Sequence, residues 1–123
     1  MNDILLIGNG GHCKSVIDLI EHERKWKIQG LICEKKGLTE NILGYPIIGT
    51  DNDLKNLKRT YKNAFNSVGQ IKYPKNRIKV SEKLENLQFF TPNIISPYSI
   101  ISKHVSLGKG NFIGHGVIIN SNS

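Results

Sequence analysis

Aliphatic side chains recur at every sixth position through the last part of the chain. The period starts at Ile95, and a serine, glycine or asparagine directly follows each aliphatic residue. The five members are Ile95, Ile101, Leu107, Ile113 and Ile119. A six-residue period fits neither an amphipathic helix nor an alternating strand, but it is typical of a hexapeptide β-helix, a solenoid of short parallel strands. We therefore expect residues 91–123 to form the first, incomplete repeats of such a solenoid.

A different pattern opens the chain. Residues 4–7 form a continuous apolar run, which is typical of a strand covered on both faces in a parallel sheet. A glycine-rich loop follows, and apolar residues then recur at helical spacing over residues 16–23. Residues 28–33 predict a second strand. The opening segment is therefore expected to be a βαβ unit.

The middle of the chain continues the alternation of strands and helices. Residues 44–49 predict a short edge strand, where a proline is tolerated. Residues 64–68 predict a third buried strand, and residues 78–87 have the spacing of a further helix. Residues 1–90 are thus expected to form one small α/β domain with a Rossmann-like parallel sheet, ahead of the repeats.

The charge balance is basic and dispersed. Seventeen lysines and arginines against ten acidic residues give a formal net charge of +7, which favours anionic partners such as nucleotides and phosphates. The basic residues form no dense block and are not interleaved with aromatic residues in the way that is typical of single-strand binding. We therefore expect no nucleic-acid partner.

The cysteines and the hydropathy argue against a disulfide-bonded, metal-binding, secreted or membrane-spanning protein. Cys13 and Cys33 lie in apolar contexts, without a CxxC pair or histidines at zinc spacing, and are expected to be reduced, packed thiols with no metal site. The amino terminus lacks the basic and apolar regions of a secretory signal. No apolar run approaches the roughly 20 residues that cross a bilayer. We expect a cytoplasmic protein without a membrane span.

The glycine-rich loop is the first candidate site. Gly8, Gly10 and Gly11 lie between a strand and a helix, where backbone N–H groups and the helix dipole can receive a phosphate. The dinucleotide fingerprint would require glycine or alanine in place of Cys13, so a nicotinamide enzyme is disfavoured. His12, in the first helical turn, is placed to donate a hydrogen bond to a ligand in the same crevice. A tight turn without a ligand and a capping or exposed histidine are the alternatives.

Two further strand ends are expected at the same edge of the sheet. Glu34 follows the second strand, where an acidic residue commonly meets a sugar or base hydroxyl, and Lys35 stands beside it. Gly69 ends the third strand. Pockets of open α/β sheets lie outside such strand ends, so we assign these residues to one substrate-binding crevice. Solvated surface charge is the alternative for the acidic residue and its lysine neighbour.

Two histidines belong to the repeats. His104 and His115 could face a groove between coils and act as a general base. An outward-facing side chain without a role is the alternative for each of them. The sequence therefore offers no catalytic residue that can be named.

The chain resembles the sugar acetyltransferases of the NeuD/PglD type. The similar segments are residues 5–15 (LLIGNGGHCKS), 43–49 (LGYPIIG), 68–79 (VGQIKYPKNRIK) and 94–102 (IISPYSIIS), followed by the hexapeptides. Together they span essentially the whole chain. The order of these motifs is more specific than any one of them.

The resemblance implies a fold, an activity and an assembly. Family members join a small nucleotide-sugar-binding α/β domain to a left-handed parallel β-helix and form homotrimers. They transfer acetyl from acetyl-coenzyme A (acetyl-CoA) to a sugar amine or hydroxyl. By position, Gly10, Gly11 and His12 match the family's glycine loop, Glu34 its acidic residue and Gly69 its third-strand loop. These residues are expected to hold a nucleotide-linked amino sugar or a sialic acid-like sugar.

The resemblance also marks a departure. The family's catalytic histidine lies in a later coil, and the sequence ends at Ser123 before reaching it, so His115 does not take over that role. We expect the chain to be the amino-terminal portion of the enzyme, which binds the sugar substrate at most. A non-catalytic trimeric binding or assembly module is the alternative.

Overall fold

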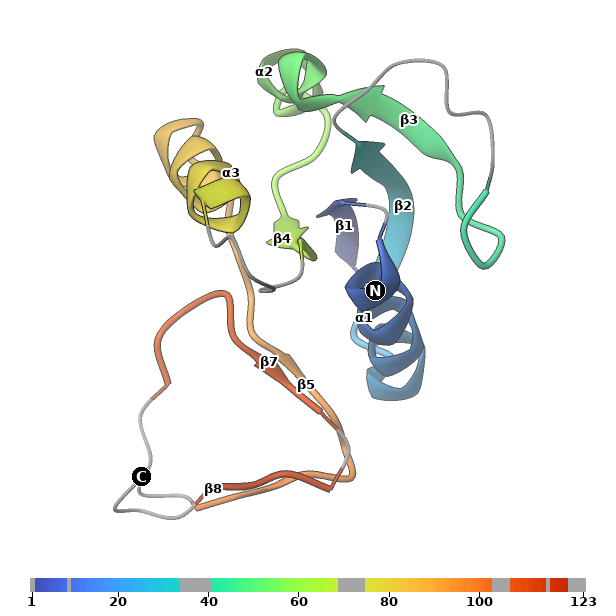
Figure 1. The fold of residues 1–123 in the computed structure, drawn as a ribbon, viewed down its shortest axis with the longest axis vertical. Coiled ribbons are helices and arrows are strands. Elements are labelled where there is room, and N and C mark those ends of the chain that lie inside the picture. Colours follow the sequence, from blue (N-terminus) through green and yellow to red (C-terminus); the bar gives the residue numbers. More distant parts are fainter. Residues whose placement is uncertain are drawn as a thin grey trace.

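A four-stranded parallel sheet forms the centre of the amino-terminal part (Figure 1). The computed structural model describes residues 2–8, 10–33, 41–68, 75–102, 107–114 and 116–119. The strands are β1 (Asn2–Ile7), β2 (Trp26–Cys33), β3 (Ile47–Thr50) and β4 (Ala64–Asn66), in the order β3-β2-β1-β4. All three strand pairs are parallel, as the continuous apolar runs predict.

The edge strand begins three residues later than expected. Ile42 and Tyr45 exchange backbone hydrogen bonds of 3.0 Å around a tight turn, in which Gly44 has a φ of +90°. Residues 42–45 therefore form this turn rather than the strand. Pro46 has no amide hydrogen to donate, but its carbonyl accepts a hydrogen bond from the Leu31 amide of β2.

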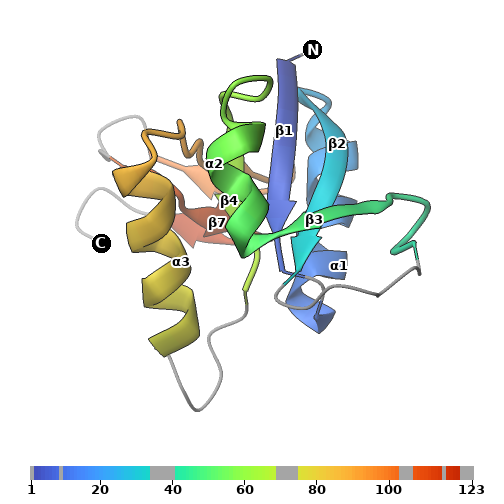
Figure 2. The same cartoon turned by 90° about the horizontal axis from the view of Figure 1, so that it is seen from above.

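Helices cover both faces of the sheet (Figure 2). Helix α1 (Gly11–Glu23) packs on one face, and α2 (Leu54–Leu57) and α3 (Lys75–Asn86) lie on the other. A 3-10 turn, η1 (Asp51–Asp53), leads into α2, and the Asp53 carboxylate accepts a 2.8 Å hydrogen bond from the Thr50 amide in front of it.

Strand β1 supplies side chains to both layers. Ile4 and Leu6 join the cluster under α1, whereas Leu5 and Ile7 join the cluster that contains Leu54 and Leu84 of the opposite helices. The four side chains of this run alternate between faces, as the strand period requires. The continuous apolar run therefore marks a strand buried on both sides.

A coil of short strands follows the α/β part. Its strands are β5 (Ile94–Ile95), β6 (Ile100–Ile101), β7 (Phe112–Ile113) and β8 (Ile118–Ile119). Strands β5 and β7 are paired in parallel, and so are β6 and β8. Each strand meets the residue eighteen positions further along, which equals three of the six-residue periods. One turn of the solenoid is thus closed.

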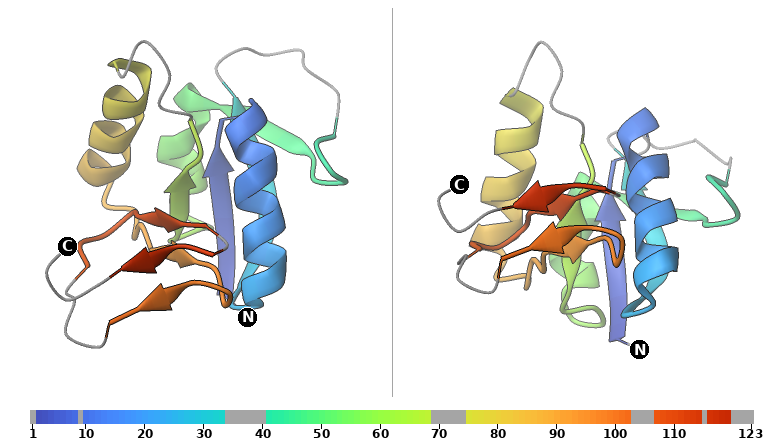
Figure 3. Two further views of the ribbon diagram at one scale, coloured as in Figure 1. Left: turned by 60° about the horizontal axis from the view of Figure 1, so that its bottom comes forward. Right: turned by 90° about the horizontal axis from the view of Figure 1, so that it is seen from below.

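The coil is left-handed. In Figure 1 the chain turns clockwise from β5 through β6 to β7, and the views of Figures 2 and 3 agree in placing β7 and β8 toward the viewer of Figure 1. A clockwise path that advances toward the viewer is a left-handed screw. The predicted fold class, a Rossmann-like parallel sheet followed by the start of a left-handed β-helix, is confirmed.

The period-six residues lie on the sheltered side of the coil. Ile113 is buried at 5% exposure, and the other four members are half-buried. By contrast, Ile100 lies directly before a member and is 63% exposed. In β6 the neighbour before the member thus faces outward, whereas its counterpart in β5, Ile94, is covered by α1 and is 0% exposed.

The coil packs directly on α1 (Figure 3). Ile94 of β5 is 0% exposed and belongs to the same core cluster as the apolar face of this helix. Helix α1 therefore has the sheet on one side and the first coil on another. The domain boundary near residue 90 remains a prediction from the sequence.

Candidate functional site

The loop after β1 has a conformation that depends on glycine. Gly8 has a φ of +110°, and its amide donates a 2.7 Å hydrogen bond to the Ile32 carbonyl of β2. A Cβ atom at this position would lie 3.2 Å from the Val68 amide nitrogen. Gly8 therefore lets the chain after β4 approach the end of β1, which brings two strand ends together.

Gly10 borders open space. It precedes α1 with extended backbone, at φ −83° and ψ −167°, and its carbonyl accepts a hydrogen bond from the Cys13 amide. A Cβ atom here would have no neighbour within 4 Å among the described residues. The first turn of α1 contains no acidic side chain, so the positive end of the helix dipole has no charged partner within that turn. This end of α1 has room for an anion.

His12 joins the loop to the coil. Its ring contacts the Phe112 ring of β7 edge to face, with 5.1 Å between centroids and 71° between planes. Burial lowers the pKa of His12, and the nearby Arg77 of α3 lowers that pKa further. The imidazole is therefore neutral at pH 7 and can donate one hydrogen bond and accept another.

Asn66 ties the end of β4 to α3. Its amide nitrogen donates hydrogen bonds of 2.8 Å to the Arg77 carbonyl and to the Ser81 hydroxyl, and its oxygen accepts one from the Val68 amide. Next to it, the buried Ser67 hydroxyl donates to the Ile7 carbonyl of β1 at 2.7 Å. These bonds fix the start of α3, with Arg77, beside the loop. Among the described residues, no carboxylate forms an ion pair with Arg77.

The two cysteines belong to the core. Cys13 and Cys33 are buried thiols outside any disulfide, as predicted. Burial raises the pKa of the Cys13 thiol, while a hydrogen bond with Ser67 opposes that rise. A protonated, enclosed thiol is a poor nucleophile, so we assign Cys13 to packing rather than to chemistry.

The structure unites only some of the predicted site residues. Gly10, Gly11 and His12 lie together at the carboxyl edge of the sheet, and their role in binding remains a prediction. Glu34, Lys35 and Gly69 lie outside the described residues, as do His104 and His115 of the repeats. No group of potential metal ligands is found in the described part of the chain.

Sequence reasoning missed Phe112 and Asn66. Both act through tertiary neighbours that are distant in the sequence, and neither stands in a motif. The sequence did offer a hint for Asn66, because an asparagine at the carboxyl end of a buried strand can hydrogen-bond to the element that follows that strand. For Phe112, only its position one residue before a member of the period gave a hint.

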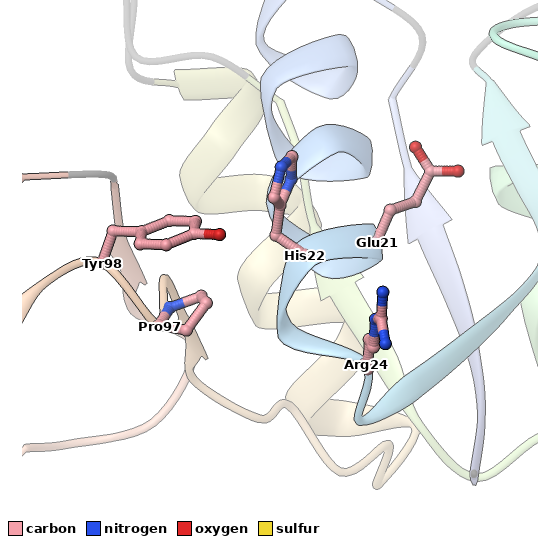
Figure 4. Close-up of a pocket in the computed structure, with 5 residues that line it drawn as sticks. All are labelled: Glu21, His22, Arg24, Pro97 and Tyr98. Atoms are coloured by element: carbon pink, nitrogen blue, oxygen red, sulfur yellow. The ribbon is translucent and has the colours of Figure 1, made fainter.

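A second hollow lies at the opposite end of α1 (Figure 4). It is open, has a volume of about 470 Å³, and is lined by Glu21, His22, Arg24, Pro97 and Tyr98. The rings of His22 and Tyr98 meet edge to face at 6.0 Å between centroids. The Glu21 carboxylate accepts a hydrogen bond from the Tyr45 hydroxyl. Both ends of α1 thus touch the coil, but only the amino-terminal end faces the strand ends of the sheet.

The family follows from comparison with known proteins. The model of the PglD N-terminal domain matches residues 3–84. The chain belongs to this family. The match covers the four strands of the sheet and most of α3. It therefore includes the ends of β1 and β4, which border the candidate site.

Solved structures extend the likeness through the coil. A perosamine N-acetyltransferase from Caulobacter crescentus, in complex with CoA and GDP-perosamine, is 28% identical with a TM-score of 0.87, over 99% of this chain and 56% of that one. The acetyltransferase domain of PglB from Neisseria gonorrhoeae, in complex with acetyl coenzyme A, shares the fold at 22% identity and a TM-score of 0.78, over 98% of this chain and 60% of that domain.

A viral protein is also similar in sequence. An uncharacterized protein of Acanthamoeba polyphaga mimivirus is 32% identical over 111 residues, which are 90% of this chain and 21% of that protein. The chain thus spans little more than half of the solved relatives and about a fifth of the viral one. No helix in the described residues has the length and apolar character needed to cross a membrane.

Proposed function

We propose that this chain supplies the sugar-nucleotide-binding part and the first coil of an acetyl-CoA-dependent sugar acetyltransferase. The substrate is a nucleotide-linked amino sugar or a sialic acid-like sugar. The observation that supports this most is the meeting of His12 with Phe112, because it places the coil against the loop at the open end of α1.

The geometry suits a sugar diphosphate. The backbone N–H groups at the start of α1 and the Arg77 guanidinium together favour two negative phosphates at the open space beside Gly10. The neutral His12 imidazole is proposed to hydrogen-bond a sugar amine or hydroxyl. Glu34, Lys35 and Gly69 are proposed to complete the crevice from the neighbouring strand ends.

The proposed reaction is an acyl transfer. The sugar nitrogen or oxygen attacks the thioester carbonyl carbon of acetyl-CoA, the carbon–sulfur bond breaks, and the coenzyme leaves as its thiol after receiving the proton lost by the nucleophile. We assign to this chain the binding and orientation of the sugar. The proton acceptor is proposed to be the family's histidine, which the resemblance places in a later coil. A cytoplasmic location and a homotrimer are part of the same proposal.

Binding tests the proposal. Isothermal titration of the 123-residue chain with GDP- and UDP-linked amino sugars should give heat, and Gly10→Asp should weaken the affinity at least about tenfold. Aspartate is a good N-cap residue, so this variant should be as stable as the parent or a few tenths of a kcal/mol more stable. Because a carboxylate at this position repels phosphate, Gly10→Asp should lose affinity for the sugar nucleotide without losing stability.

Gly10→Asn is the matched control. It adds a capping side chain of the same size without the charge, so it should bind more tightly than Gly10→Asp. Equal affinities of all three chains would contradict a phosphate at this position. Binding of a nicotinamide dinucleotide in the absence of any heat from the sugar nucleotides would overturn the proposed function.

A non-catalytic assembly module is the second candidate. The Ile100 side chain of β6 is 63% exposed, which favours a partner on this face of the coil. A discrete trimer that binds no sugar nucleotide would support this candidate over the enzyme.

A further inference from the structure

Glu23 connects the last turn of α1 to the first strand of the coil. Its Oε2 atom accepts a hydrogen bond of 3.2 Å from the Ile95 amide, between residues 72 positions apart in the sequence. Its other oxygen, Oε1, is closed off from solvent and has no hydrogen-bond partner among the described residues. The Glu23 carboxylate thus hydrogen-bonds to β5 through one of its two oxygens.

The strand that Glu23 holds is the most enclosed part of the coil. Ile94 is fully buried in the cluster under α1, and Ser96 is 2% exposed. The Ser96 amide donates to the Ile113 carbonyl of β7, and the Ser96 hydroxyl accepts from the Tyr98 amide. The position of β5 on α1 therefore also sets the position of β7 and of the turn toward β6.

Strand β7 carries the residue that meets the candidate site. Phe112 is the register partner of Ile94, and its ring contacts His12 at the other end of α1. A shift of β5 along α1 would therefore move Phe112 away from His12.

We propose that Glu23 is a positioning residue, whose hydrogen bond to the Ile95 amide fixes the coil on α1 and thereby places Phe112 against His12 at the sugar site. That this is a sugar site rests on the proposed function, whereas the Glu23–Ile95 hydrogen bond and its effect on the position of Phe112 do not. Glu23 contacts no substrate in this role. It acts through β5 and β7.

The acceptor oxygen, rather than the negative charge, carries this role. Burial raises the pKa of Glu23, and the Ile95 hydrogen bond and the nearby Lys25 only partly oppose that rise. Burial therefore disfavours the ionised form, and a neutral side chain with an oxygen at the same place should still accept the Ile95 hydrogen bond and hold β5. Glutamine has such an oxygen, and leucine has a similar volume without one.

Three variants separate the hydrogen bond from packing. Glu23→Leu should speed hydrogen exchange of the Ile95 amide at least about tenfold and raise the pKa of His12 toward its ordinary value, since Phe112 no longer covers it. Exchange of the β1 amides should stay unchanged. Glu23→Gln should keep both readouts near those of the parent, and Glu82→Ala, on the exposed side of α3, should change neither.

The outcome decides the proposal in either direction. If Glu23→Leu retains the slow exchange at Ile95 and the His12 pKa of the parent, packing alone positions the coil and the proposal is wrong. If β1 exchange accelerates equally in Glu23→Leu, the residue serves general stability rather than position, and the proposal is again overturned. Neither readout requires a ligand, so a failure of sugar-nucleotide binding would be recognised separately.

Discussion

At the scale of single residues, environment rather than residue type decides the chemistry. His12 and Glu23 stand near opposite ends of one helix, and burial is the main cause of the pKa shift in both. Burial disfavours the charged form, so it lowers the pKa of the imidazole and raises that of the carboxyl. The same helix thus presents the neutral His12 imidazole near the carboxyl edge of the sheet and the Glu23 carboxyl group, whose ionisation is disfavoured by burial, toward β5 of the coil.

The histidine gives a pH-dependent prediction. The folded pKa of His12 lies below its ordinary value of 6.5, so the folded state prefers the neutral form. The contribution of this residue to stability is full above pH 6.5 and is lost as the pH falls through the folded pKa. Thermal unfolding of His12→Gln should therefore show less loss of stability on acidification than the parent shows.

Arg77 provides the internal check on that assignment. Arg77→Gln removes the second cause of the shift and should raise the pKa of His12 only part of the way, as followed by NMR titration of the ring protons. A His12 pKa at or above 6.5 in the parent would contradict the enclosed position of the ring.

At the scale of elements, the side-chain hydrogen bonds that join β4 to α3 within the described residues all come from the Asn66 amide. Asn66 donates twice and accepts once across this junction, so its three bonds hold a strand end, a loop and a helix. Short strands of three residues have few ladder bonds of their own. Such a junction depends on side-chain hydrogen bonds more than a long strand does.

Asn66→Ala should destabilise the chain by roughly 1–3 kcal/mol in denaturant unfolding, because the Val68 amide loses its acceptor and the hydrogen bonds to the Arg77 carbonyl and the Ser81 hydroxyl are lost. The loss should be accompanied by faster hydrogen exchange in α3 and weaker sugar-nucleotide binding. Asn86→Ala, at the exposed end of the same helix, is the control and should stay within about 0.5 kcal/mol. A parent-like stability of Asn66→Ala would show that packing alone holds α3.

The sequence predicts elements well and their mutual contacts poorly. The apolar run of residues 4–7 and the six-residue period indicate a doubly buried strand and a solenoid, because periodicity is a local property of the chain. The pairs His12–Phe112 and Glu23–Ile95 have no such signal. They arise because the coil docks on α1, and that docking depends on tertiary packing rather than on spacing.

At the scale of the whole molecule, the coil presents one apolar outer face. Ile100 of β6 is 63% exposed and Val117, directly before β8, is 39% exposed, and the Ile100 amide donates a hydrogen bond to the Val117 carbonyl. Exposed aliphatic side chains on neighbouring segments are typical of a surface that another chain covers. The proposed homotrimer would provide that cover.

Ile100→Lys should therefore reduce self-association. Sedimentation velocity of the parent should show a discrete trimer, and the variant should sediment mainly as monomer at the same concentration, because a lysine resists burial against a second copy. Ile78→Lys, which changes an exposed isoleucine on α3, is the matched control and should sediment as the parent does. A trimer that survives Ile100→Lys would place the contact elsewhere.

The sharing of α1 between sheet and coil has a consequence for how the molecule comes apart. Because Ile94 is embedded in the main core cluster, removing the coil would expose apolar surface of the helix on which the sheet also depends. The two parts should then melt in one cooperative transition rather than in two steps. Exchanging coils between members of the family would require the matching face of this helix to be exchanged with them.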